Sequence, residues 1–334
     1  MRSPVIVAFV ILYSRLASIA SVEHIDNDLY KISIKQDYYF DEVLNANISK
    51  PEDLADFINH KTFFGLTDSL VENVDFGCSS FLAQTPDGDF IAGRNYDYAE
   101  AGELALYTNP SDGFASIGMT EFGALGLNGE LGIEPDSLLG KTVMMFAPYA
   151  TMDGVNEKGV MVSILQLTPG ATHPRTEKPD ITITVAIRLI LDRAESVDHA
   201  IELLQQYDVH GEGEYAHHLF ISDSSGNAAV VEWPGSQMKV VKDQPAVTNF
   251  FLSNRSKVFY CGSCDRYDKI VDWLSHHSTT TSEQAMDVLK SVSQSGGEYP
   301  TQWSAVYNLN DFCMDVTIDR NYDKVYHFTT KDFN

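Results

Sequence analysis

The chain has 334 residues and a globular composition, with 44% hydrophobic and 21% charged residues. This length is enough to bury a sizeable core in one large domain or two. The formal net charge of −24 argues against nucleic acid and anionic membrane surfaces as partners, because those surfaces are themselves negative. It also suits an acidic compartment, where partial protonation reduces self-repulsion.

Residues 1–20 have the features of a secretory signal peptide. Arg2 supplies the positive start, Val5–Tyr13 forms an apolar run, and Ser18-Ile19-Ala20 offers a small-x-small cleavage site. The apolar run is too short to cross a bilayer, although a short membrane anchor is the alternative interpretation. We therefore expect a secreted, periplasmic or lysosome-like protein with no stable membrane span once residues 1–20 are removed.

Residues 21–77 carry twelve acids, four lysines and no cysteine. Short helical pieces are predicted at Leu54–Ile58 and Phe63–Leu70. The segment is expected to pack but to carry no chemistry of its own. Two interpretations stay open, namely a propeptide and an N-terminal segment that stays attached.

The chemistry of the chain is concentrated in a predicted β-hairpin. Alternating apolar residues predict strands at Ser79–Gln84 and Asp89–Ala92, joined by a Pro-Asp-Gly turn. Cys78 opens the first strand, and Arg94 and Asp97 follow the second, so we expect all three to lie close together. A neighbouring Arg lowers a thiol pKa and favours the nucleophilic thiolate. The plainer interpretation is a hairpin with a small buried Cys.

Further strands and a polar turn follow the hairpin. Apolar runs predict strands at Leu104–Tyr107, Phe114–Met119 and Thr142–Ala147, with a loop at Glu121–Gly140. The run Asp153-Gly154-Val155-Asn156-Glu157-Lys158-Gly159 then forms a polar turn. It leads into a buried strand that ends at Gln166.

The second half alternates helices and strands. Helical spacing predicts helices at Ile181–Ala194, around Ala200–Leu204, over Asp265–His276, and from a Thr280-x-x-Glu283 capping box through Val292. Strands are predicted at His218–Ile221, Ala228–Trp233, Met238–Val241, Gln302–Leu309, Phe312–Ile318 and Lys324–Thr329. This order of strand runs and paired helices predicts an α+β layered domain.

Two further motifs have structural explanations. His217 and His218 are adjacent on a strand and so point to opposite faces, which favours structural histidines over a metal site. Cys261-Gly262-Ser263-Cys264 matches most of the papain signature, but Asp265 stands where an aromatic residue belongs. We expect a local disulfide or two thiols there, and an unpaired core thiol at Cys313.

The pattern Cys78-x15-Arg94-Asn95-x-Asp97 on a strand–turn–strand resembles the choloylglycine hydrolase family. This family comprises bile salt hydrolases and penicillin V acylases, with acid ceramidase and N-acylethanolamine acid amidase as distant relatives. The Asp153–Gly159 turn, the strand end at Val247-Thr248-Asn249, and Arg266 are similar to the family's later motifs. The resemblance covers Cys78 to the end of the chain and implies a four-layer αββα sandwich of the N-terminal-nucleophile hydrolase type.

The resemblance also implies a mechanism for residues 78–334 as a catalytic domain. Cutting the chain between Gly77 and Cys78 would free the α-amine of Cys78, which moves the proton while its thiol attacks a linear amide. The glycine would let the backbone bend sharply at this bond. In this scheme Arg94 favours the thiolate and Asp97 orients the amine.

The same resemblance assigns the remaining site residues. The Asn249 amide and the Gln166 backbone N–H hold the oxyanion, and Arg266 supports the pocket. Many bile salt hydrolases have Asn and penicillin acylases have Tyr at the position of Gln166, which leaves the acyl group open. An alternative for Arg266 is a solvated charge on a helix face.

We therefore expect a hydrolase of a small N-acyl amide that needs no metal or organic cofactor. The amide is left open among bile salts, penicillin V, ceramide-like lipids and N-acyl amines. Nucleic acid is not an expected partner, and a homo-oligomer is compatible with the sequence. The alternatives are a secreted non-catalytic or binding relative with the same fold and an unrelated thiol protease.

Overall fold

The computed structural model describes residues 22–26, 29–62, 77–99, 102–121, 137–167, 170–211, 213, 215–253, 264–297 and 299–333. A nine-stranded sheet has the order β1 (Glu23–Asp26), β2 (Leu29–Ile34), β5 (Glu103–Thr108), β6 (Ser116–Glu121), β7 (Thr151–Asn156), β8 (Val160–Leu167), β11 (Ala216–Asp223), β12 (Ala228–Glu232) and β13 (Lys239–Lys242). A six-stranded sheet has the order β14 (Ala246–Thr248), β3 (Gly77–Gln84), β4 (Phe90–Asp97), β15 (Thr301–Asn308), β16 (Cys313–Ile318) and β17 (Tyr326–Phe328). Strands β9 (Asp180–Thr182) and β10 (Asp208–His210) pair separately.

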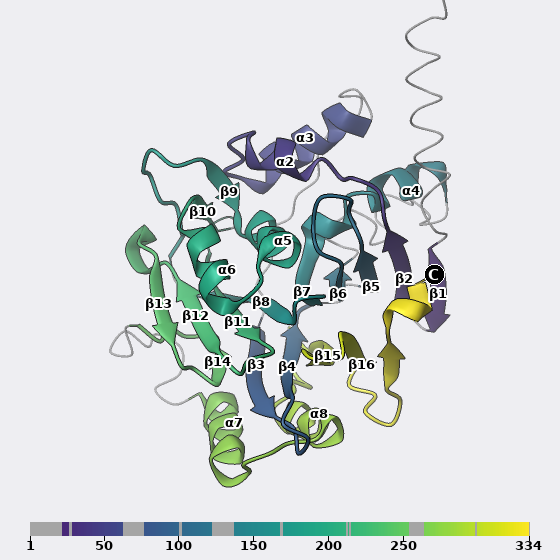
Figure 1. Cartoon of the computed structure of the whole chain (residues 1–334), viewed down its shortest axis with the longest axis vertical. Helices are drawn as coiled ribbons and strands as arrows, with labels where there is room; N and C mark the ends of the chain where they lie inside the picture. Colours follow the sequence, from purple (N-terminus) through teal and green to yellow (C-terminus); the bar gives the residue numbers. More distant parts are fainter. Residues whose placement is uncertain are drawn as a thin grey trace, which may run out of the picture.

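Two pairs of helices cover the outer faces of the two sheets (Figure 1). Helices α5 (Ile183–Arg193) and α6 (Val197–Leu204) pack on the nine-stranded sheet, through β7 and β8 for α5 and through β11 and β12 for α6. Helices α7 (Asp265–His276) and α8 (Ser282–Ser291) pack on the six-stranded sheet. The sheets contact each other through β3 with β8 and β6 with β16. The predicted α+β fold of four αββα layers is therefore confirmed.

Alternate side chains of β3 face two different hydrophobic cores. Cys78 and Leu82 face the inner core between the sheets, whereas Phe81 and Ala83 pack with Ile270 in the outer core under α7 and α8. Adjacent strand residues point to opposite faces, so the strand that carries Cys78 contributes side chains to both cores.

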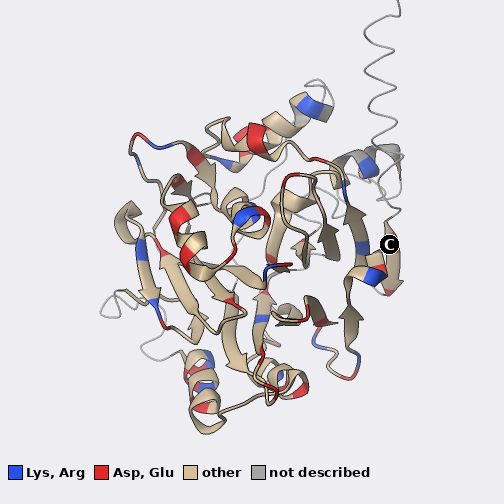
Figure 2. Ribbon diagram, viewed as in Figure 1, with Lys and Arg blue, Asp and Glu red and all other residues tan. Residues whose placement is uncertain are grey.

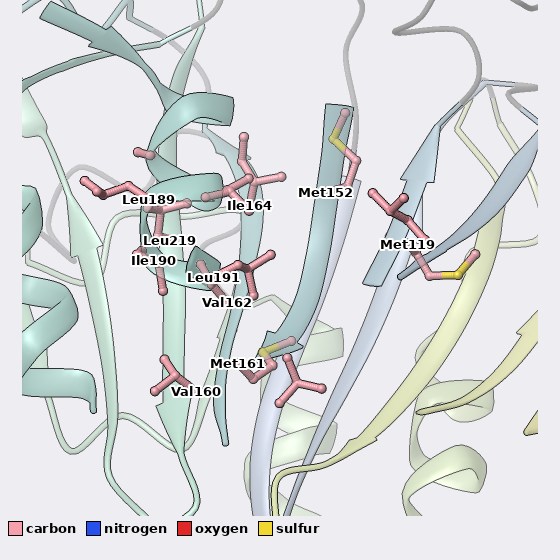
Figure 3. Packing of buried hydrophobic residues seen from close by; sticks show 14 of the residues in the cluster. Met119, Met152, Val160, Met161, Val162, Ile164, Leu189, Ile190, Leu191 and Leu219 are labelled. Carbon is pink, nitrogen blue, oxygen red and sulfur yellow. The ribbon is translucent and has the colours of Figure 1, made fainter. Parts of the chain in front are cut away.

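Apolar side chains occupy the interior, and most charged residues lie on helices and loops (Figure 2). Figure 3 shows Leu189 and Leu191 of α5 beside Val162 and Ile164 of β8, all of them buried. The helix predicted at Ile181–Ala194 is confirmed over Ile183–Arg193, and all its residues from Ile183 to Asp192 are buried. Within the described residues, no helix combines the length and the apolar character needed to cross a membrane.

Residues 22–62 are built into the nine-stranded sheet. Strand β2 pairs in parallel with β5, and its side chains Leu29, Ile32 and Ile34 are buried in the main core. Helices α2 (Phe40–Leu44) and α3 (Pro51–Thr62) follow, so the helical piece predicted at Leu54–Ile58 is a longer helix. The piece predicted at Phe63–Leu70 and the signal segment 1–20 lie outside the described residues.

The strand predicted at Thr142–Ala147 is wrong. Residues 142–144 end α4 (Leu138–Met144), residues 145–146 form a turn, and Ala147 begins a 3₁₀ helix at Ala147–Ala150. The Ser137 side chain caps α4 by accepting a hydrogen bond from the Gly140 amide at 3.0 Å. Periodicity alone cannot tell a strand from a buried helix in a short apolar run. The capping residue Ser137 is the local signal that marks this run as a helix.

Some predicted boundaries also shift. The capping box of α8 is formed by Thr281 and Gln284, one residue after the predicted Thr280 and Glu283. The Thr280 hydroxyl instead accepts from the Trp273 indole at 3.3 Å. The second hairpin strand is longer than predicted and runs to Asp97.

Candidate functional site

The predicted site residues converge where β3 begins and where β4 and β14 end, beside α7. Cys78 on β3 is paired with Tyr96 on β4, and Gly77 is paired with Asp97. Asn249 directly follows β14, whose Thr248 pairs with Ser79. Arg266 lies in the first turn of α7, and Gln166 lies near the end of β8.

The Cys78 thiol is fully buried and faces the inner core beside Arg94. Burial raises the pKa of this thiol to about 12, and the Arg94 charge opposes that rise. The Asp97 carboxylate adds to the rise, while the Asp97 backbone N–H opposes it. Sequence reasoning had the direction of the Arg94 effect right, but the expected net lowering is wrong for the intact chain because desolvation dominates.

Arg94 is held in the core by a set of buried partners. Its Nε lies 3.2 Å from Asp153 Oδ2 in an ion pair with no solvent exposure, and its Nη2 donates to the Ile164 carbonyl at 2.7 Å. Asp153 also accepts from the Trp303 indole at 3.1 Å and from the Tyr307 hydroxyl. Burial raises the pKa of Asp153, and Arg94 opposes this shift. The guanidinium is therefore fixed beside the thiol.

Asp97 is a buried carboxylate with both oxygens occupied. Oδ2 accepts from Arg266 Nη1 and from Gln294 Nε2, each at 2.7 Å, and Oδ1 accepts from the Thr301 hydroxyl at 2.5 Å. Burial raises the pKa of Asp97, and the charge of Arg266 is the largest opposing influence. In the intact chain Asp97 thus contacts Arg266 rather than the Cys78 nitrogen.

Asn249 connects the Cys78 backbone to the Gln166 backbone. Its Oδ1 accepts from the Cys78 backbone N–H at 2.7 Å and from Arg266 Nη2 at 2.9 Å. Two donors on one atom fix that atom as the oxygen, so Nδ2 donates to the Gln166 carbonyl at 2.8 Å. An amide nitrogen carries a second N–H, which is the donor that an oxyanion would use.

Arg266 contacts three site residues at once. Besides Asp97 and Asn249, its Nη1 donates to the Cys78 carbonyl at 3.1 Å. The side chain is only 20% exposed. This geometry favours the site assignment over the alternative of a solvated charge on a helix face.

Sequence reasoning missed Gln294, Thr301 and the partners of Arg94. Gln294 and Asp97 are 197 positions apart, so no local pattern joins them. Asp153 stood within the recognised turn motif, but nothing in its spacing indicated an ion pair with Arg94. These contacts depend on how the two sheets are stacked.

Among the described residues, the other candidate motifs form no second site. Burial lowers the pKa of His217 to about 3, and His218 lies 3.6 Å from the buried Glu232 carboxylate. No group of three or more metal-ligating side chains occurs within the part of the chain that the structure describes. Cys264 is buried and accepts from the Thr248 hydroxyl at 3.1 Å, whereas Cys261 lies outside the described residues. Cys313 on β16 is half-buried with a free thiol.

Comparisons with known proteins agree with this geometry. The family described as "Acyl-coenzyme A:6-aminopenicillanic acid acyl-transferase" matches residues 139–323. A penicillin V acylase of Pectobacterium atrosepticum is 29% identical over 178 residues, which are 49% of this chain and 46% of that protein. The chain therefore spans about half the length of this curated relative.

Solved structures share the fold. A variant of the conjugated bile acid hydrolase from Clostridium perfringens superposes with a TM-score of 0.58 at 14% identity, covering 77% of this chain and 93% of that one. Penicillin V acylase from Agrobacterium tumefaciens superposes with a TM-score of 0.54 at 15% identity, covering 76% and 86%. At these identities the likeness establishes the N-terminal-nucleophile hydrolase fold.

Proposed function

Since the chain belongs to the acyl-coenzyme A:6-aminopenicillanic acid acyl-transferase family, we propose that it hydrolyses a linear, non-peptide amide with Cys78 as the nucleophile. The observation that carries this proposal is the convergence of Arg94, Asp97, Asn249 and Arg266 on Cys78. Four polar side chains from three separate stretches of the sequence meet around one buried cysteine, which is costly for a purely structural core. Names of relatives point the same way, toward acylases and hydrolases of amides.

The proposed reaction is acyl transfer through a thioester. Cys78 Sγ attacks the amide carbonyl while the α-amine of Cys78 accepts the thiol proton and returns it to the leaving amine. Arg94 stabilises the thiolate, and Asp97 orients the α-amine. Asn249 Nδ2 and the Gln166 backbone N–H hold the oxyanion, a contribution typically worth about 10²–10³ in rate. Water then releases the acid.

Maturation by cleavage between Gly77 and Cys78 is part of the same proposal. In the intact chain the Cys78 nitrogen is a peptide N–H bonded to Asn249, and the thiol has a pKa of about 12. A free amine beside this thiol supplies the missing base. We propose that residues 1–20 direct secretion, that the cut is autocatalytic, and that residues 78–334 form the catalytic domain.

The proposed substrate is a small N-acyl amide. Similar proteins are named for penicillin V and for conjugated bile acids, and both compounds join an acyl group to an amine through a linear amide. Gln166 borders the site next to Asn249, so its side chain is our candidate for selecting the acyl group.

The test uses the full-length chain from a secreting host, analysed by intact mass, N-terminal sequencing and a panel of amides. Wild type should begin at Cys78 and hydrolyse at least one of penicillin V, a conjugated bile acid, a ceramide or an N-acyl amine. Cys78→Ala should stay uncut and inactive. Cys264→Ala is the matched control and should remain cut and active.

Two outcomes would replace this proposal. Activity lost in Cys264→Ala but kept in Cys78→Ala would indicate an unrelated thiol protease. An uncut wild-type chain with an unreactive Cys78 would indicate a secreted binding protein with the same fold.

A further inference from the structure

Gly77, the residue before the proposed nucleophile, lies against two polar side chains. A Cβ on Gly77 would lie 2.7 Å from Gln294 Nε2 and 3.1 Å from Asp97 Oδ2. Gly77 is extended in β3, opposite Asp97, and its φ is not in the left-handed region. Close approach rather than a sharp bend therefore explains the glycine, and the expected bend is wrong.

Gln294 is fixed in this place by contacts of its own. Its Nε2 donates to Asp97 Oδ2 at 2.7 Å, and its backbone N–H donates to the Thr301 hydroxyl at 2.8 Å. The Thr301 hydroxyl in turn donates to Asp97 Oδ1 at 2.5 Å. Gln294 and Thr301 together thus hold both oxygens of the carboxylate beside the scissile bond.

We propose that Gln294 is a positioning residue for self-cleavage and that it restricts residue 77 to glycine. Its amide fills the space that a Cβ would need, and from there it holds Asp97 against the Gly77–Cys78 bond. This inference rests on the proposed cleavage at that bond. It adds a rule for which residue can precede Cys78 and names the side chain that enforces it.

The step that Gln294 assists is an N-to-S acyl shift. The Cys78 sulfur bonds to the Gly77 carbonyl carbon, the bond from that carbon to the Cys78 nitrogen breaks, and the thiol proton moves to the departing nitrogen. Water then hydrolyses the thioester, which gives the Gly77 carboxylate and restores the thiol. A methyl group on residue 77 pushes the Gln294 amide away from Asp97, so the carboxylate loses a donor during this shift.

The test measures the rate of cleavage in full-length variants by intact mass. Gly77→Ala should slow cleavage about 10- to 100-fold, the range expected for losing one hydrogen bond to a charged group. Gly296→Ala is the matched control, because a Cβ there would meet nothing within 4 Å. It should cleave at the wild-type rate.

Double variants separate steric restriction from a general structural role. Gln294→Ala removes the nearest obstacle and the hydrogen bond, so adding Gly77→Ala to it should slow cleavage less than Gly77→Ala does in wild type. Gln294→Met keeps the bulk but has no hydrogen bond to lose, so Gly77→Ala should slow cleavage much less in that background than the roughly 10- to 100-fold expected in wild type. A Gly77→Ala chain that cleaves at the wild-type rate, or an alanine penalty unchanged by Gln294→Ala, would overturn the inference.

Failure of the proposed function looks different. If wild type stays uncut, like Cys78→Ala, self-cleavage itself is wrong and the role of Gln294 falls with it. If wild type is cut and only the double-variant pattern fails, the proposed function stands without this role for Gln294.

Discussion

The guanidinium of Arg94 shows how a charge can be kept next to a buried thiol. Neither Arg94 nor Asp153 has any solvent exposure, and Trp303 and Tyr307 add donors to the carboxylate. Removing two charges from water costs several kcal/mol per ion, which their attraction and hydrogen bonds must offset. The pair therefore fixes the geometry of the site more than it adds stability.

Removing one partner of the Arg94–Asp153 ion pair should reveal the cost of burying the remaining charge. We expect Asp153→Ala to lower the free energy of unfolding by about 3–5 kcal/mol, because it leaves the Arg94 charge buried and unpaired. Urea denaturation in the Cys78→Ala background measures this without interference from cleavage. Glu202→Ala, an exposed position on α6, is the control and should change stability by less than about 0.5 kcal/mol. A similar small effect for Asp153→Ala would refute the role of the pair.

At the scale of elements, the N-terminal strands and the C-terminal end of the chain hold each other. Tyr326 donates to Asp26 at 2.6 Å, and Lys324 forms an ion pair with the same carboxylate. Lys31 on β2 donates to the Asp332 carbonyl at 2.8 Å. On the other side of the segment, the Tyr38 hydroxyl donates to the buried Asp192 at 2.5 Å. Residues 22–62 are thus anchored at both edges.

We predict from these contacts that the piece before Cys78 stays bound after the cut. Both pieces should elute together in gel filtration and separate only in denaturant. Tyr38→Phe should weaken their association by about 1.5–3 kcal/mol, because Asp192 is charged and buried. Tyr326→Phe should cost about 1 kcal/mol or less, since Asp26 is partly exposed. Elution of a free N-terminal piece in native buffer would contradict the prediction.

The elements that sequence predicted well are those set by local rules. The closeness of Cys78 to Arg94 and Asp97 follows from a short hairpin, and Asp265–His276 has a clear helical period. The place of Asn249 and Arg266 came only from family resemblance. Their contacts with Cys78 span 171 and 188 positions, and tertiary packing alone determines them.

At the scale of the whole molecule, the net charge and three buried carboxylates both favour the folded state as the pH falls, whereas one buried histidine opposes it. The net charge of −24 repels itself less as carboxylates gain protons. Burial raises the pKa of Asp97, Asp153 and Asp192, so the folded state binds protons more readily there and gains stability as the pH falls toward 3.8. His217 works against this trend.

The pKa of His217 falls to about 3 in the folded chain from 6.5. The unfolded state therefore takes up a proton below pH 6.5 while the folded state does not, and stability is lost as the pH falls toward 3. At pH 4.5 the loss should be about 3 kcal/mol. His217→Asn should remove it, as measured by urea denaturation at pH 7.5 and 4.5. The exposed His276→Asn control should keep the wild-type difference, and an equal difference in His217→Asn would disprove this account.

The position of the proposed cut within β3 affects how maturation can be observed. From Cys78 onward the ladder of β3 with β4 and β14 is complete, so breaking the bond before Cys78 needs no strand to move. Trp303, stacked on Tyr96 with ring centroids 4.0 Å apart, should keep its surroundings. The circular dichroism and tryptophan fluorescence spectra should therefore change little during activation. Cleavage should be detected chiefly by the change in chain mass and by the reactivity of the new α-amine of Cys78.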